Sequence, residues 1–133
     1  MVLIDQLGWA PLCISIIEDK FEMVEILITN GANPNMLDGT GMSPLSEAIL
    51  ALSLKIVTFL VENGANMNTL NADGFSSFHK AVISDNADIL QYFTQNGAEL
   101  KAKNFDGYDA LEVALNTKKH NGAKILLYNM FLV

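Results

Sequence analysis

The chain of 133 residues contains no arginine, one cysteine and two histidines. Binding to a phosphate backbone relies on clustered Lys and Arg. Because the chain has only eight lysines, no arginine and a net charge of −7, we expect no nucleic-acid partner. The single cysteine, Cys13, excludes an internal disulfide and fits a reducing compartment, so we expect an intracellular, cytoplasmic protein. His79 and His120 lack a cysteine or carboxylate pair at metal-ligand spacing, so we expect no metal and no cofactor.

The sequence also lacks long apolar runs and local signs of catalysis. No run approaches the length that spans a bilayer, and residues 1–8 lack the basic region of a signal peptide, so we expect neither membrane insertion nor a secretory leader. The glycine-rich residues 38–41 are not followed by the lysine of a phosphate-binding loop. Nothing around Cys13 predicts the lowered thiol pKa of a nucleophile. We therefore expect that the protein is not an enzyme.

What the sequence has instead is a regular period. The tripeptide Asn-Gly-Ala occurs three times, each copy 33 residues after the last, starting at Asn30, Asn63 and Asn96. Four glycines repeat with the same spacing, at Gly8, Gly41, Gly74 and Gly107. A period of this size is typical of a solenoid, in which each repeat buries its apolar face against its neighbours.

Local signals within the period predict two short helices in each repeat. Ser43, Ser76 and Asp109 can accept hydrogen bonds from amides at a helix start, and Pro11 and Pro44 suit the first helical position. The glycine of each Asn-Gly-Ala copy supplies the left-handed residue that ends the second helix. A column of small residues follows the first helices: Ser15, Ala48, Ala81 and Ala114. The second helices carry apolar residues at helical spacing that we expect to be buried, beginning with Val24, Ile26 and Leu27.

The openings and endings of the repeats match a known pattern. Residues 41–45 read Gly-Met-Ser-Pro-Leu and residues 74–79 read Gly-Phe-Ser-Ser-Phe-His. Together with Asn-Gly-Ala, they resemble the ankyrin repeat, whose pattern is Gly-x-Thr-Pro-Leu-His, two short helices and Gly-Ala-Asp-x-Asn. The resemblance implies an all-α ankyrin-repeat solenoid of stacked helix-turn-helix units with β-hairpin or loop fingers. We expect a single domain of residues 1–133, with repeats at about 5–35, 36–68, 69–101 and 102–133.

The resemblance also has functional implications. It implies a non-catalytic adaptor or scaffold that binds a partner protein or peptide through the concave groove of the array. At His79 it implies a structural hydrogen bond to Ser76. It further suggests asparaginyl hydroxylation at Asn35 and Asn68, each of which has a leucine eight residues earlier. The alternative role for these asparagines is hydrogen bonding within turns.

Candidate partner-binding residues fall in columns that the stack does not need. The residue after each turn glycine, which is free to vary in the family and would point toward the groove, is large here: Trp9, Met42, Phe75 and Tyr108. A second column, on the inward side of the first helices, begins Ile17, Leu50 and Ile83. Finger-tip residues would add specificity: Thr40, Asp73 and Asp106. Exposed apolar stripes often mark interaction sites. The alternative is that these side chains pack on the next finger, or in the case of Trp9 cover the end of the first repeat.

Charge is uneven along the chain. Residues 1–35 hold five acids and one lysine, whereas residues 102–133 hold three acids and four lysines. The acidic residues of the first repeat either form a solvated helix face or attract a basic partner: Glu18, Asp19, Glu22 and Glu25. We expect the ligand to be a helix or an extended peptide with apolar anchors and a basic residue near these acids.

Departures from the family pattern leave two functional classes open. The residue between the two helices is usually glycine but is here Asp19, Leu52, Asp85 and Lys118. Because leucine adopts a left-handed conformation poorly, we expect a different turn at Leu52. Met130 replaces the glycine that would end the last helix, and neither terminal repeat resembles a polar cap. Either the chain is a segment of a longer adaptor, or it self-associates as a homodimer through its apolar groove or its uncapped ends.

Overall fold

The structure is a computed structural model that describes the backbone of residues 9–131 and the side chains of residues 11–131. Within this range eight α-helices follow in pairs: α2 (Trp9–Ile17), α3 (Phe21–Thr29), α4 (Pro44–Leu50), α5 (Leu54–Glu62), α6 (Ser77–Ser84), α7 (Ala87–Gln95), α8 (Ala110–Asn116) and α9 (His120–Phe131). The predicted all-α, helix-turn-helix fold class is confirmed. The chain divides into two compact units, Met1–Asn66 and Met67–Val133.

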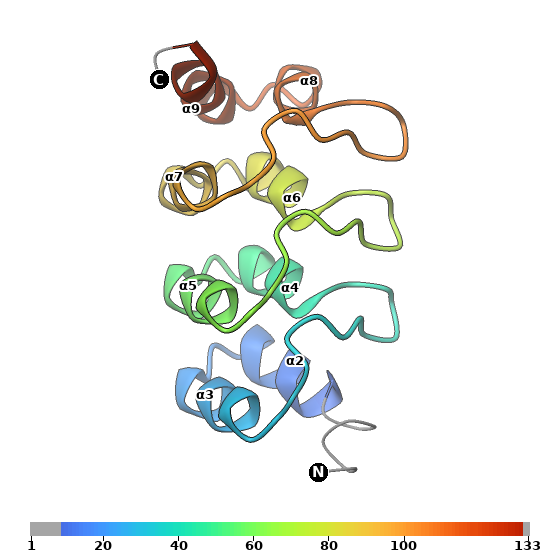
Figure 1. Ribbon diagram of the computed structural model, residues 1–133, viewed down its shortest axis with the longest axis vertical. Helices are drawn as coiled ribbons and strands as arrows, with labels where there is room; N and C mark the ends of the chain where they lie inside the picture. Colours follow the sequence, from blue (N-terminus) through green and yellow to red (C-terminus); the bar gives the residue numbers. More distant parts are fainter. Residues whose placement is uncertain (1–8, 132–133) are drawn as a thin grey trace. The chain divides into compact units, whose positions relative to one another are not determined.

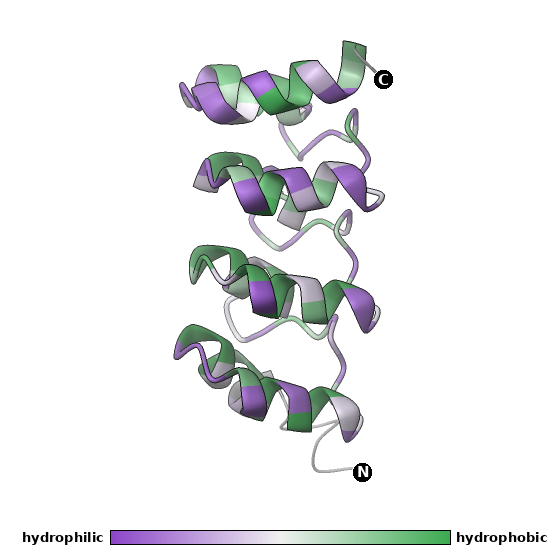
Figure 2. Ribbon diagram, turned by 90° about the vertical axis from the view of Figure 1, so that its left-hand side faces the viewer, coloured by the Kyte–Doolittle hydropathy of each residue, from purple (hydrophilic) through white to green (hydrophobic). Residues whose placement is uncertain are grey.

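Each unit contains two helix pairs in two layers. In the first unit α2 packs against α4, and α3 packs against α5. In the second unit α6 packs against α8, and α7 packs against α9. Within each unit the first helices of the pairs lie between the second helices and the fingers, which are the loops of residues 33–43, 67–76 and 99–109 (Figure 1). The second helices, seen from the side away from the fingers, present mixed polar and apolar residues (Figure 2).

The helix starts follow the predicted caps. The side chains of Ser43, Ser76 and Asp109 accept hydrogen bonds from the backbone amides three residues later, at 3.1, 3.2 and 2.9 Å. Pro44 is the first residue of α4, as predicted. Pro11, in contrast, is the third residue of α2 rather than its first, because that helix already begins at Trp9.

The turns between paired helices share one conformation. Asp19, Leu52, Asp85 and Lys118 all have a positive φ, between 55° and 58°. The expectation of a different turn at Leu52 is therefore wrong, since packing of the two helices imposes the left-handed conformation on leucine as well. The turn is closed by the Ser53 amide, which donates to the Ala48 carbonyl at 3.2 Å.

The core lies between the two layers of each unit. The small column of the first helices is buried, as are Val24, Val57, Leu90 and Leu126 of the second helices. The expectation that Ile26 is buried is wrong, because its position on α3 faces solvent while Ile28 turns inward. The last helix, α9, has twelve residues where α3, α5 and α7 have nine, which is consistent with Met130 standing in place of the terminating glycine.

Candidate functional site

Each finger is held in shape by one polar side chain at its base. Asp38 donates its amide to the Met42 carbonyl at 2.8 Å, and its carboxylate accepts the amides of Thr40 and Met42 at 2.8 and 3.0 Å. Burial raises the pKa of Asp38, but these bonds and the Thr40 hydroxyl outweigh it, so the pKa lies below its ordinary value. Asn104 makes the same pattern, accepting the amides of Asp106 and Tyr108, each at 3.0 Å.

The sequence reasoning missed these anchors, although the signal was present. Asp38, Asn71 and Asn104 stand at the 33-residue period, and all three are polar residues that favour turns. The backbone amide of Asn71 donates to the Phe75 carbonyl at 2.9 Å, and the side-chain amide of Asn71 donates to the same carbonyl at 2.7 Å. The anchors fix the residue after the turn glycine, which belongs to the first candidate binding column.

The apolar and aromatic binding residues predicted in the second unit come together. Phe75, Ile83 and Tyr108 line a hollow of about 170 Å³ between the fingers and the first helices α6 and α8. The rest of its lining comes from the last finger, from α8 and from the residue that follows α8: Asn104, Asp106, Val113, Asn116 and Thr117. Tyr108 is 43% exposed. The column of Phe75 and Tyr108 and the column of Ile83, which the sequence predicts separately, therefore meet at one surface of this unit.

Phe75 is the most firmly held of these residues. Its ring meets the His79 ring edge to face, with 6.2 Å between centroids, and the Lys80 ammonium lies 5.9 Å above it. Phe105, which belongs to none of the predicted columns, packs on the neighbouring finger. Its amide donates to the Gly74 carbonyl at 3.1 Å, and its ring would lie 2.7 Å from a Cβ added to Gly74. Tyr108 is thus left to face the hollow.

The first unit has a related hollow. Ile17 and Leu50 are exposed and line it together with Glu47 and Ala51, over about 300 Å³. Met42 is half-buried on its finger and does not line this hollow. The prediction for Trp9 concerns a side chain outside the described residues.

Two of the three finger-tip side chains, those of Thr40 and Asp73, bind partners within their own repeats. The Thr40 hydroxyl donates to the Asp38 carboxylate at 2.6 Å. Asp73 forms a salt bridge with Lys80 of α6, and although burial raises its pKa, the bond from Lys80 holds the pKa below its ordinary value. Asp106 is exposed and lines the hollow of the second unit. Of the three, Asp106 is the one placed beside the apolar candidates.

The surroundings of His79 and Cys13 indicate structural roles for both side chains. The His79 Nδ1 accepts the Ser76 amide at 3.2 Å and lies 2.8 Å from the Ser76 hydroxyl, which confirms the implied bond. Its Nε2 faces the Ala102 carbonyl at 3.1 Å, and burial lowers the pKa of this histidine. Burial, followed by the charges of Asp38 and Glu47, raises the pKa of Cys13 to about 11. A thiol with this pKa is a poor nucleophile.

The two candidate hydroxylation residues link successive helix pairs within their units. The Asn35 amide group donates to the Gly64 carbonyl at 2.9 Å and accepts the Asn66 amide at 2.8 Å. Asn68 accepts the Glu99 amide at 2.9 Å. These bonds reach the next repeat rather than closing a local turn. Hydroxylation stays a prediction, which an intact-mass gain of one oxygen atom per site would support.

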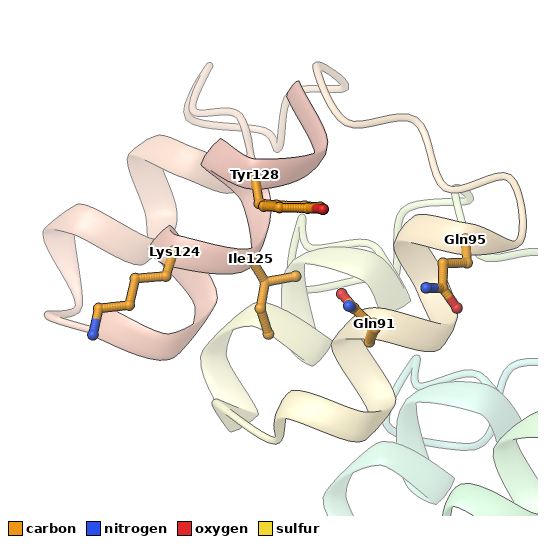
Figure 3. Close-up of a pocket in the computed structure, with 5 residues that line it drawn as sticks. All are labelled: Gln91, Gln95, Lys124, Ile125 and Tyr128. Atoms are coloured by element: carbon orange, nitrogen blue, oxygen red, sulfur yellow. The ribbon is translucent and has the colours of Figure 1, made fainter. Parts of the chain in front are cut away.

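A larger hollow lies on the other side of the second unit. Gln91 and Gln95 of α7 and Lys124, Ile125 and Tyr128 of α9 surround about 450 Å³, with the Tyr128 ring above Ile125 (Figure 3). Tyr128 is 59% exposed. Three of the five side chains are long and polar, so this is a shallow depression between helices and lacks the aromatic pair of the finger-side hollow.

Other kinds of site find no support in the described part of the chain. Across residues 9–131, no group of three or more His, Cys, Asp or Glu side chains could hold a metal ion. None of the helices in this range is both long and apolar enough to span a membrane.

Comparison with known proteins identifies the family. A family model described as ankyrin repeats (3 copies) matches residues 2–71 and 53–132. A search of the curated proteins found no match. Ankyrin repeats are generally protein–protein interaction modules and are generally non-catalytic. With matches over nearly its whole length, the chain belongs to the ankyrin repeat family.

Proposed function

We propose that the protein is a non-catalytic adaptor that binds a partner protein through its fingers and first helices. The observation that carries this proposal is the hollow lined by Phe75, Ile83 and Tyr108. Aromatic side chains that are exposed in the free protein and desolvated on binding each contribute on the order of 2 kcal/mol or more. Ile17 and Leu50 of the first unit offer a second apolar surface on the same type of helix.

The size of the second-unit hollow favours one kind of ligand. Small-molecule sites usually occupy roughly 300–1,000 Å³ and enclose most of their ligand. A hollow of about 170 Å³ is smaller than that and suits a single apolar side chain of a protein partner. Because Asn104 holds the finger that carries Tyr108, this side of the hollow needs little reorganisation on binding.

The polar rim favours a basic group next to the anchor. The Asp106 carboxylate is exposed beside the hollow, whereas the Thr117 hydroxyl donates to the Val113 carbonyl at 2.6 Å and has already used its proton. The net charge of −7 adds a general attraction for cations. We therefore propose a partner segment that carries an apolar side chain and, next to it, Lys or Arg.

A matched pair of tyrosine variants tests this function. Tagged protein is used to capture partners from cell extract, and the captured proteins are quantified by mass spectrometry. We expect Tyr108→Asp to reduce the specific partner about tenfold or more, which corresponds to roughly 1.4 kcal/mol. Tyr128→Asp changes a tyrosine on α9 that is more exposed than Tyr108, at 59% against 43%, and should leave capture unchanged. Equal capture by both variants, with unaltered melting, would overturn the proposal.

A further inference from the structure

The last helix pair exposes an apolar position that is buried in the pair before it. Leu115 of α8 is 61% exposed, whereas Val82, one period earlier on α6, is fully buried. What covers Val82 is the next pair of the same unit. A Cβ added to Gly122 of α9 would lie 3.4 Å from the Val82 side chain and 3.6 Å from Leu90. Position 122 therefore packs on Val82.

The position equivalent to Gly122 in the first pair is also exposed. Three periods before Gly122 stands Met23 of α3, which is 46% exposed. The equivalent residues of α5 and α7, Ile56 and Ile89, are fully buried. The chain thus presents one half of an inter-repeat contact at Leu115 and the other half at Met23.

The polar part of the same contact is complementary in charge. Asp85, in the turn after α6, accepts the Gly122 amide at 3.0 Å, and Asn121 lies 3.4 Å from it. One period after Asp85 stands Lys118, and three periods before Asn121 stands Glu22. A contact in the same register would place a lysine beside a glutamate.

An aromatic contact in the first unit predicts a further pair of residues in the same register. The Phe21 ring meets the Phe59 ring edge to face at 5.4 Å, and the Lys55 ammonium lies 4.1 Å above Phe21. Three periods after Phe21 stands His120. One period before Phe59 stands Ile26, and one period before Lys55 stands Glu22. Glu22 would then lie next to both Lys118 and His120.

We propose that a second copy of this chain stacks its first helix pair on the last helix pair of the first copy. Leu115 packs on Met23, His120 packs on Ile26, and Lys118 pairs with Glu22. The acidic first repeat and the lysine-rich last repeat favour this head-to-tail orientation over the reverse. The face around Met23 differs from the face around Leu115, so a pair of copies still has one free face of each kind. Further copies can therefore add as concentration rises. This contact does not use the hollow between the fingers and the first helices.

Two variants that each block one face test the proposal by sedimentation equilibrium. Met23→Asp disrupts the face of the first helix pair, and Leu115→Asp disrupts the face of the last helix pair. Both residues are exposed. The unmodified protein should rise from 14.5 kDa to multiples of this mass with concentration. Each variant alone should remain at 14.5 kDa. An equimolar mixture should reach twice that mass and stop, because one intact face of each kind remains.

Charge reversal supplies the second arm. Lys118→Glu should weaken association about tenfold or more, and combining it with Glu22→Lys should restore it. Tyr108→Asp should leave association unchanged, which separates this contact from the proposed partner site. A single-chain mass for the unmodified protein at all concentrations would overturn the proposal. So would association of either blocked variant on its own, or a mixture that fails to pair.

Discussion

Leu52 carries a larger conformational cost than Asp19 and Asp85, which stand one period before and after it with nearly the same positive φ. Its φ of 57° lies in the left-handed region, which costs residues with a Cβ about 1–2 kcal/mol and costs glycine almost nothing. Aspartate, which occupies the same position in two other turns, tolerates this region better. The side chain of Leu52 is exposed and repays little of the cost by burial.

We therefore predict that Leu52→Gly raises the free energy of unfolding by up to about 1 kcal/mol, after the entropic cost of glycine. Leu50→Gly is the matched control, because Leu50 is also exposed but is the last residue of α4 and does not have a positive φ. It should lower the free energy of unfolding by up to about 1 kcal/mol. Urea denaturation of both variants measures the two changes, and a shift of the same sign in both would contradict the assignment of strain to Leu52.

His79 links stability to pH through its buried, neutral ring. Because the Ser76 amide donates to Nδ1, the proton resides on Nε2 and is donated to the Ala102 carbonyl. Burial lowers the pKa of His79 in the folded state. Above the unfolded pKa of about 6.5 both states are neutral, and below it the unfolded state binds a proton that the folded state does not.

We predict that the stability of the second unit is highest above about pH 6.5 and falls as pH decreases toward the folded pKa of His79. Urea unfolding between pH 8 and pH 5 should show a slope approaching about 1.4 kcal/mol per pH unit from this group. His79→Gln should remove that part of the slope, and His120→Gln should keep it. Identical slopes in the unmodified protein and in His79→Gln would refute the role of His79.

At the scale of helices and fingers, local contacts were predictable and distant ones were not. The caps at Ser43, Ser76 and Asp109 could be read from the sequence because each joins a side chain to an amide three residues away. The bond from the Gly122 amide to Asp85 spans 37 residues and depends on how α9 packs beside the turn after α6. No local pattern contains that information.

Asp85 satisfies an amide in the first turn of α9, so its loss should destabilise that helix. Asp85→Ala removes the acceptor and also strains the left-handed turn, and we predict a loss of about 1–2 kcal/mol. Asp85→Asn keeps an acceptor oxygen and tolerates the left-handed region, so it should stay within about 0.5 kcal/mol of the unmodified protein. Thermal melting of the two variants measures the difference, and equal losses would show that the hydrogen bond is not the cause.

The candidate site was predictable to the extent that it follows the period. Phe75 and Tyr108 share one column and Ile83 belongs to the other, and the three residues line one hollow. The partner-binding role of these residues stays a prediction. The salt bridge between Asp73 and Lys80 could not be read from the sequence, because it depends on how the finger folds back on α6.

At the scale of the molecule, the two sides of the helix layers carry different surfaces. The finger side of each unit holds the apolar candidates, whereas the second helices present mixed residues and the polar-rimmed depression at Tyr128 (Figures 2 and 3). A partner that binds as proposed should contact the first side and not the second.

Methyl NMR during titration with the captured partner tests this claim most directly. Exposed or half-buried methyl groups divide into two sets, with Ile17, Leu50 and Ile83 on the first helices and Ile26, Ile125 and Leu127 on the second helices. We predict that resonances of the first set shift or broaden on binding while those of the second set stay unchanged. Changes confined to Ile26, Ile125 and Leu127 would contradict binding through the fingers and first helices.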